Sequence, residues 1–140
     1  MKYYVFDTDI AGFMQQDHPA VVRRVQILSA DDNLATTIIT FNEDISGWQA
    51  KCRRARNASA RSLAYSRLQR ALDFYCHKQC LPFDEASVKI FDQLNGQKIR
   101  IGANDLAIAA ITLSVNGILV TRNVVDFQRI PGLPIEDWTK

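Results

Sequence analysis

The sequence holds few of the residue types on which disulfide frameworks and soft-metal sites depend. Among its 140 residues there are three cysteines and two histidines. An odd, small number of cysteines argues against the disulfide framework of a small secreted domain. Cys76 and Cys80 flank His77 at a spacing that could bind a soft metal, but no second pair exists. Buried or incidental thiols are therefore the better interpretation.

Long apolar runs and a strong net charge are also missing. No apolar segment approaches the roughly 18 residues of a membrane span, and no apolar signal core follows Lys2. We therefore expect a cytoplasmic protein that does not associate with a membrane. The formal net charge of +2 is too small to indicate a polyanionic partner by itself. The length predicts one domain, residues 1–140, large enough to bury a core.

Acidic residues are absent from a long window between Ile45 and Leu72. Seven of the seventeen basic residues fall in it: Lys51, Arg53, Arg54, Arg56, Arg61, Arg67 and Arg70. The apolar spacing predicts two helices that break near Asn57. A solvated helix face and a phosphate-binding surface are both compatible with this pattern.

Along the chain, the spacing of apolar residues alternates between the period of a strand and that of a helix. Short β-prone runs are expected at 3–6, 34–39 and 118–121, with a last short strand at Ile135. Helical spacing occupies 10–14, 20–28, 84–96 and 106–113, and the last of these is apolar nearly all round, which predicts burial. Strands that alternate with helices predict an α/β fold with a mainly parallel sheet.

Carboxylates stand at equivalent places in this pattern. Asp7 follows the first strand, Glu43 follows the second, Asp105 opens the buried helix and Asp126 follows the penultimate strand. A parallel topology brings these positions to one edge of the sheet. Clustered carboxylates repel one another, and a divalent cation such as Mg²⁺ or Mn²⁺ relieves that repulsion.

Simpler explanations exist for two of these acids. Asp7 or Thr8 could cap the helix that follows, as short polar residues do. Thr40 and Glu43 fit a capping box, in which the two side chains satisfy each other's backbone donors. Both explanations stay open beside the metal-binding one.

Five motifs, in order and spacing, give the chain a family resemblance. The motifs are Val5–Asp9, Thr40–Gly47, Ile101–Ala110, Leu119–Phe127 and Ile130–Leu133. With them the chain resembles PIN-domain ribonucleases of the VapC toxin type, from type II toxin–antitoxin systems. The resemblance implies a three-layer PIN-like sandwich with a mainly parallel central sheet flanked by helices. It also implies a metal-dependent endoribonuclease that forms homodimers and is inhibited by a cognate antitoxin.

The resemblance further implies roles for individual residues. A metal-binding and catalytic acidic set would comprise Asp7, Glu43, Asp105 and Asp126, supported by Thr121 and Asn123. The family commonly has asparagine where this chain has Asp9, which leaves open whether Asp9 is a ligand or lies outside the ligand set. The candidates for contact with flanking RNA phosphates are Arg53, Arg54 and Arg56, although in this family the same region can face the partner protein.

Two other functions fit parts of the sequence. Asp7-Thr8-Asp9 also resembles the opening of haloacid-dehalogenase-type phosphatases, in which the first acid is a nucleophile and the second a general acid. That function needs a later lysine beside an acidic pair, and no acidic pair follows Lys98 closely. A non-catalytic PIN-like module that only binds RNA or protein would normally have lost some of the four acids, and all four are present.

Overall fold

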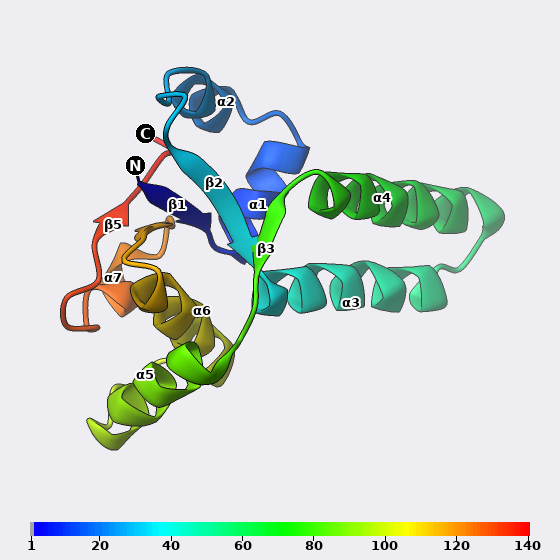
Figure 1. Cartoon of the computed structure of the whole chain (residues 1–140). Coiled ribbons are helices and arrows are strands. Elements are labelled where there is room, and N and C mark those ends of the chain that lie inside the picture. Colours follow the sequence, from blue (N-terminus) through cyan, green and yellow to red (C-terminus); the bar gives the residue numbers. More distant parts are fainter. Residues whose placement is uncertain (1) are drawn as a thin grey trace.

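The computed structural model describes residues 2–140 and is built on a five-stranded sheet. The strands lie in the order β3-β2-β1-β4-β5, and every neighbouring pair is parallel (Figure 1). Their bounds are Tyr3–Phe6 (β1), Asn33–Thr37 (β2), Gln79–Leu81 (β3), Ile118–Val120 (β4) and Ile135–Glu136 (β5). The predicted parallel α/β sheet is confirmed. The chain leaves β1 toward β2 on one side and returns at β4 on the other, which makes a switch point beside β1, where such sheets bind ligands.

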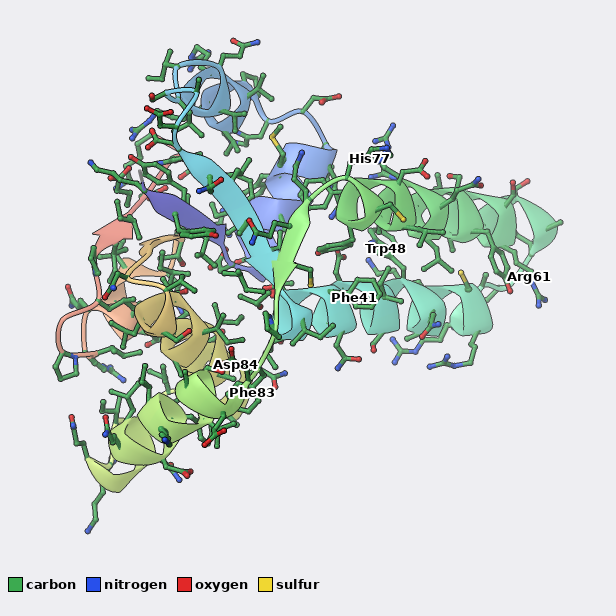
Figure 2. The ribbon with its side chains drawn as sticks, in the orientation of Figure 1. Phe41, Trp48, Arg61, His77, Phe83 and Asp84 are labelled. Carbon is green, nitrogen blue, oxygen red and sulfur yellow. The ribbon has the colours of Figure 1, made fainter. Side chains whose placement is uncertain are left out.

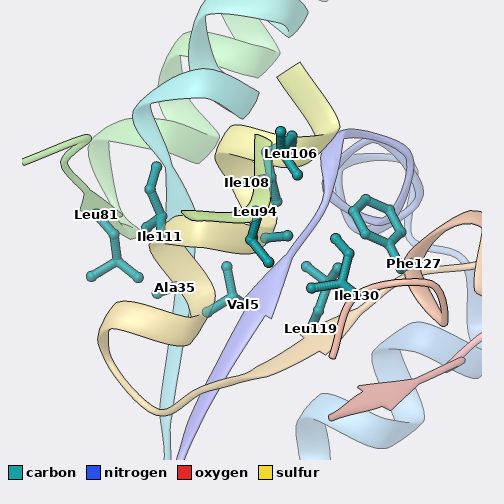
Figure 3. Packing of buried hydrophobic residues seen from close by; sticks show 11 residues of the cluster. Val5, Ala35, Leu81, Leu94, Leu106, Ile108, Ile111, Leu119, Phe127 and Ile130 are labelled. Carbon is teal, nitrogen blue, oxygen red and sulfur yellow. The ribbon is translucent and has the colours of Figure 1, made fainter. Parts of the chain in front are cut away.

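Residues 2–140 form seven helices beside the sheet. They are α1 (Thr8–Gln15), α2 (Pro19–Gln26), α3 (Ile38–Arg54), α4 (Ala58–Cys76), α5 (Glu85–Gly96), α6 (Ala103–Ser114) and α7 (Val124–Phe127). On one face, Val5, Ala35 and Leu119 of the strands pack under Ile108 and Ile111 of α6 (Figure 3). The alternate strand residues, among them Phe6 and Val120, pack on the other face with α1 and α2. Helices on both faces give the three layers.

The buried helix predicted around 106–113 is α6. Every residue from Leu106 to Thr112 is buried, which explains its lack of a polar stripe. Its N-terminal turn carries Asp105 to the edge of the sheet, and at its other end the backbone turns at Asn116, which adopts a positive φ of 53°.

The basic window folds as a helical hairpin that projects from the sheet. Helices α3 and α4 lie side by side and extend away from the strands (Figure 1). Asn57 caps α4 by accepting from the Ala60 amide at 2.8 Å, so the predicted break is confirmed. Phe41 and Trp48 lie on the side of α3 that faces α4 (Figure 2). Arg61 lies near the far end of the hairpin, away from the sheet.

The start of α3 differs from the prediction at two points. Strand β2 ends at Thr37, whereas the β-branched run had predicted a strand through Ile39. Thr37 is the cap of α3, because its hydroxyl oxygen accepts from the Thr40 amide at 3.1 Å. Thr40 thus lies inside the helix, and the predicted capping box of Thr40 and Glu43 is wrong. Glu43 has other partners.

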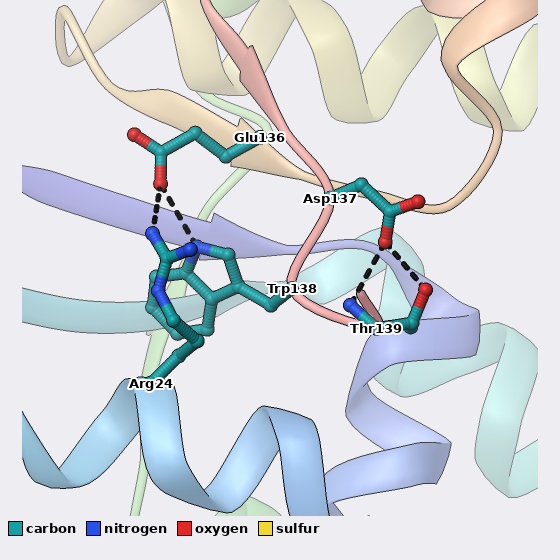
Figure 4. A network of polar contacts seen from close by, with 5 residues as sticks. All are labelled: Arg24, Glu136, Asp137, Trp138 and Thr139. Carbon is teal, nitrogen blue, oxygen red and sulfur yellow. Dashed lines mark hydrogen bonds and ion pairs between the residues drawn. The ribbon is translucent and has the colours of Figure 1, made fainter.

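The C-terminal segment adds β5 at the edge of the sheet next to β4 and packs Trp138 on the face of β1. Trp138 is fully buried and its ring centroid lies 5.3 Å from that of Tyr4. Glu136 accepts from the Trp138 indole and from Arg24 of α2, both at 2.9 Å (Figure 4). No helix within residues 2–140 has the length and apolarity needed to cross a membrane.

Candidate active site

Asp7 lies at the carboxyl end of β1 and is 6% exposed. One carboxylate oxygen accepts from the Ile10 amide at 2.9 Å, which caps α1. The other accepts from the Thr121 hydroxyl at 2.6 Å, just beyond β4. The capping explanation of Asp7 is therefore correct, but it accounts for one oxygen only. The second oxygen joins two neighbouring strands at the switch point.

Burial raises the pKa of Asp7 to about 6. The hydrogen bonds from Thr121 and Ile10 act in the opposite direction, and the negative charges of Asp9 and Asp105 add to the increase. Desolvation outweighs two good hydrogen bonds because removing a carboxylate from water disfavours its ionised form strongly. Asp7 thus bears a charge that its surroundings do not neutralise.

Glu43, in the second turn of α3, points to the same edge. It accepts from the Thr8 hydroxyl at 2.6 Å and from the Asn104 side-chain amide at 3.2 Å. These donors come from α1 and α6, so Glu43 connects three helices. Both donors are neutral, and they orient the carboxylate while leaving its charge uncompensated.

A cavity of about 260 Å³ lies between these side chains. Its lining comprises Asp7, Thr8, Asp9, Glu43, Asp105, Asn123 and Phe127. Asp105 is partly buried here, and its pKa is raised first by burial and then by the charges of Glu43, Asp126 and Asp9. The fold therefore brings three of the four predicted acids, together with Asp9, onto one cavity.

Asp126 lies next to this cavity and is tied to it by a series of hydrogen bonds. The Asn123 side-chain amide donates to Asp126 at 2.9 Å, and the Asn123 backbone N–H donates to the Thr121 hydroxyl at 2.9 Å. Thr121 in turn donates to Asp7. Asp126 also has a cationic neighbour, Arg129, at 3.8 Å.

The acids surround the cavity without closing onto a single point. Within residues 2–140, no three Asp, Glu, His or Cys side chains are close enough together to coordinate one ion. Among the same residues, no lysine or arginine forms an ion pair with the four acids that line the cavity. A set of oxygen donors with uncompensated charge suits a hard cation such as Mg²⁺, which keeps several waters and needs few protein ligands.

Sequence reasoning missed three residues at this site. Thr8 and Asn104 hold Glu43, and Phe127 forms an apolar part of the cavity lining. Thr8 and Asn104 each directly adjoin a predicted acid in sequence, which is the one signal that could have indicated them. Their partner is more than thirty residues away, so the pairing depends on tertiary structure.

The predicted phosphate contacts lie elsewhere. Arg53, Arg54 and Arg56 are exposed near the far end of the hairpin. Arg53 is ten residues beyond Glu43 on the same helix, which is roughly 15 Å at about 1.5 Å per residue. None of the three lines the acidic cavity.

The chain is similar to known proteins in both sequence and structure. No family model matches the sequence. Ribonuclease VapC1 of Haemophilus influenzae strain R2866 is 34% identical over 139 residues, which is 98% of each chain. Ribonuclease VapC2 of Rickettsia felis is 30% identical over 138 residues, again 98% of each. The tRNA(fMet)-specific endonuclease VapC of Shigella flexneri is 27% identical and covers 99% of this chain and all of that protein.

Solved structures match over the same extent. VapBC-1 from nontypeable Haemophilus influenzae superposes with a TM-score of 0.76 at 30% identity, covering 99% of each chain. DNA-bound VapBC from Salmonella typhimurium gives a TM-score of 0.77 at 24% identity and covers 99% of each chain.

The parallel sheet and the acids gathered beyond its carboxyl edge define a PIN-domain protein. At 34% identity over nearly the whole of both chains, it belongs to the VapC family, the ribonuclease toxins of toxin–antitoxin pairs. Neither the phosphatase alternative nor a purely binding module explains this full-length similarity to ribonucleases.

Proposed function

We propose that this ribonuclease hydrolyses RNA phosphodiester bonds with the help of a divalent cation, Mg²⁺ or Mn²⁺, in the acidic cavity. Asp7 and Asp105 would be the central ligands, with Glu43 and Asp126 binding directly or through water. Asp9 would contribute charge beside them. The observation that carries the proposal is the cavity itself, whose four acidic side chains have no cationic partner among residues 2–140.

The chain's own residues would prepare this site before RNA arrives. Thr121 and the Ile10 amide fix the two oxygens of Asp7, and Thr8 with Asn104 fixes Glu43. A bound cation would favour the ionised form of Asp7, whose pKa is raised by burial. Such a cation supplies Lewis-acid chemistry at the phosphate and makes water a stronger nucleophile.

The partners follow from the same family. We propose RNA as substrate, a cognate antitoxin as inhibitor and a homodimer as the assembled toxin, acting in the cytoplasm as a single nuclease domain, residues 1–140. The support for the antitoxin is that solved relatives are described as VapBC assemblies and, in Klebsiella pneumoniae, as a toxin–antitoxin complex. Initiator tRNA is the first substrate to test, because two relatives are named for it.

The test is the variant Asp105→Asn. The matched control is Asp92→Asn, at an exposed position of α5. We expect Asp105→Asn to abolish Mg²⁺-dependent cleavage of tRNA(fMet) and of total RNA. We also expect Mg²⁺ to raise the melting temperature of the wild type and of Asp92→Asn, with little effect on Asp105→Asn, because a ligand that binds only the folded state stabilises it. Undiminished cleavage by Asp105→Asn would contradict the site assignment.

A further inference from the structure

A second cavity, of about 350 Å³, adjoins the acidic one. The two cavities share Thr8 and Asp9 in their linings. The rest of the second lining comprises Gly12, Phe13, Gln16, Asp44 and Arg122. The two cavities therefore lie side by side at this edge of the sheet.

Arg122 is the residue that distinguishes this second cavity. It follows Thr121 directly, and its guanidinium carbon lies 5.1 Å from the centroid of the Phe13 ring. Within residues 2–140 its side chain forms no ion pair and donates no hydrogen bond. The aromatic face thus holds the guanidinium by a cation–π contact, while its N–H donors are free for a ligand.

The positive charge of Arg122 suits an anionic ligand, and two acids, Asp9 and Asp44, share the lining with it. Arg122 is the one cationic residue in the described lining of either cavity. The carboxylate of Asp44 is already occupied, since it accepts from Gln15 at 2.7 Å and from Tyr75 at 2.8 Å. An acidic site that must admit a polyanion needs a positive group close by, and the basic hairpin tip is roughly 15 Å away along α3.

We infer that Arg122 binds the RNA phosphate next to the scissile one and that the Phe13 ring holds it in position. A planar guanidinium with free donors suits two parallel hydrogen bonds to phosphate. This inference rests on the proposed function, in which the acidic cavity is where the bond is cut.

The experiment compares Arg122→Gln, Arg122→Lys and Phe13→Leu with Arg23→Gln, a control at an exposed arginine of α2. The substrate is a synthetic RNA oligonucleotide that spans a cleavage site mapped with the wild type. We expect Arg122→Gln to raise KM about tenfold or more, the usual effect of losing a charge-assisted hydrogen bond. Arg122→Lys should recover part of the loss, Phe13→Leu should show a smaller one, and Arg23→Gln none.

Oligonucleotides with one neutral methylphosphonate linkage identify the phosphate. Neutralising the linkage beside the scissile one should weaken wild-type binding and leave Arg122→Gln almost unaffected, because the two changes remove the same contact. These binding measurements use the Asp105→Asn background, so that RNA is not consumed.

Two results would overturn the inference while leaving the proposed function intact. One is Mg²⁺-dependent cleavage by Arg122→Gln with wild-type KM. The other is an Arg122→Gln variant that loses antitoxin binding in a pull-down but keeps its RNA affinity, which would make Arg122 a contact to the partner protein. Failure of the proposed function is seen separately, as cleavage by Asp105→Asn.

Discussion

The acidic cavity and the tip of the basic hairpin lie toward opposite ends of one helix. Helix α3 carries Glu43 in its second turn and Arg53 and Arg54 in its last. The acid is fixed by donors from two other helices, whereas the arginines are exposed and have no ion pair among the described residues. The Glu43 carboxylate is thus held in place by the fold, whereas the exposed arginine side chains of the hairpin are not fixed by an ion pair.

The two regions also differ in what their charges do to stability. Burial, together with the negative charge gathered at this edge, raises the pKa of Asp7 and of Asp105 and disfavours the folded state. The basic residues in the last turn of α3 complement the negative end of the helix dipole. A ligand is therefore needed to explain the acids, but not to explain the arginines.

Among the variants that separate the two regions, Glu43→Gln should have the largest effect. Glutamine retains an oxygen that can accept from Thr8 or Asn104, so we expect the free energy of unfolding to change by about 1 kcal/mol or less. Activity should fall at least about a hundredfold, because changing even an outer contact of a metal site costs 10- to 100-fold. Chemical denaturation and a cleavage assay measure the two effects.

Glu85→Gln is the matched control for this variant. Glu85 is exposed and faces Lys89 at 3.7 Å on the surface of α5, so its change should leave activity unaltered. If Glu43→Gln remains active and only its stability falls, Glu43 serves to join helices and has no part in catalysis.

Asp7→Asn should give the next largest effect, on stability. The folded-state pKa of Asp7 is about 6 against an ordinary 3.8, so between these values the folded protein binds more protons than the unfolded chain. Stability of the metal-free wild type should therefore fall as pH rises from about 4 to about 6, by up to about 3 kcal/mol. The variant removes this loss but leaves Thr121 or Ile10 without an acceptor, at a cost of about 1 kcal/mol.

We accordingly expect metal-free Asp7→Asn to exceed the wild type by about 2 kcal/mol near pH 7.5. The difference should shrink or reverse near about pH 4. Urea unfolding at both pH values, with exposed Asp31→Asn as control, provides the measurement. A difference that does not depend on pH would mean that Asp7 titrates normally and that the cavity is better hydrated than its burial indicates.

The position of the acidic cavity was largely predictable from sequence, because the alternation of strands and helices places the acids at one edge of the sheet. A carboxylate after a parallel strand lies at the carboxyl edge whatever the detailed packing, and so does one in the first turn of a helix that leads into such a strand, which is why Asp7 and Asp105 line one cavity. The predicted boundary between β2 and α3 was wrong, because local signals conflict there. Ile38 and Ile39 favour a strand by side-chain shape, yet the Thr37 hydroxyl caps a helix that begins at Ile38.

The contacts between distant segments could not be predicted. Asp44 joins α1 to α4 through Gln15 and Tyr75, and Arg122 lies over Phe13. Nothing in the sequence near these residues identifies their partners, because each pairing depends on how whole helices pack. The basic window was evident in sequence, but its projection away from the sheet was not.

The smallest expected effect concerns that window. Changing Arg53, Arg54 and Arg56 together to glutamine should leave the cleavage position unchanged, because these residues lie roughly 15 Å from the cavity along α3. If they contact RNA phosphates, the plot of log affinity against log salt should flatten by up to about two units, at about 0.7 per phosphate on a single strand. Titrations of labelled RNA at several salt concentrations, in the Asp105→Asn background, measure the slope.

The matched control changes Arg23, Arg100 and Lys98, three exposed cations outside the hairpin, and should alter the slope less. An unchanged slope in the hairpin variant would show that its arginines do not touch RNA, and weaker capture of the co-expressed antitoxin by the same variant would assign that surface to the partner protein.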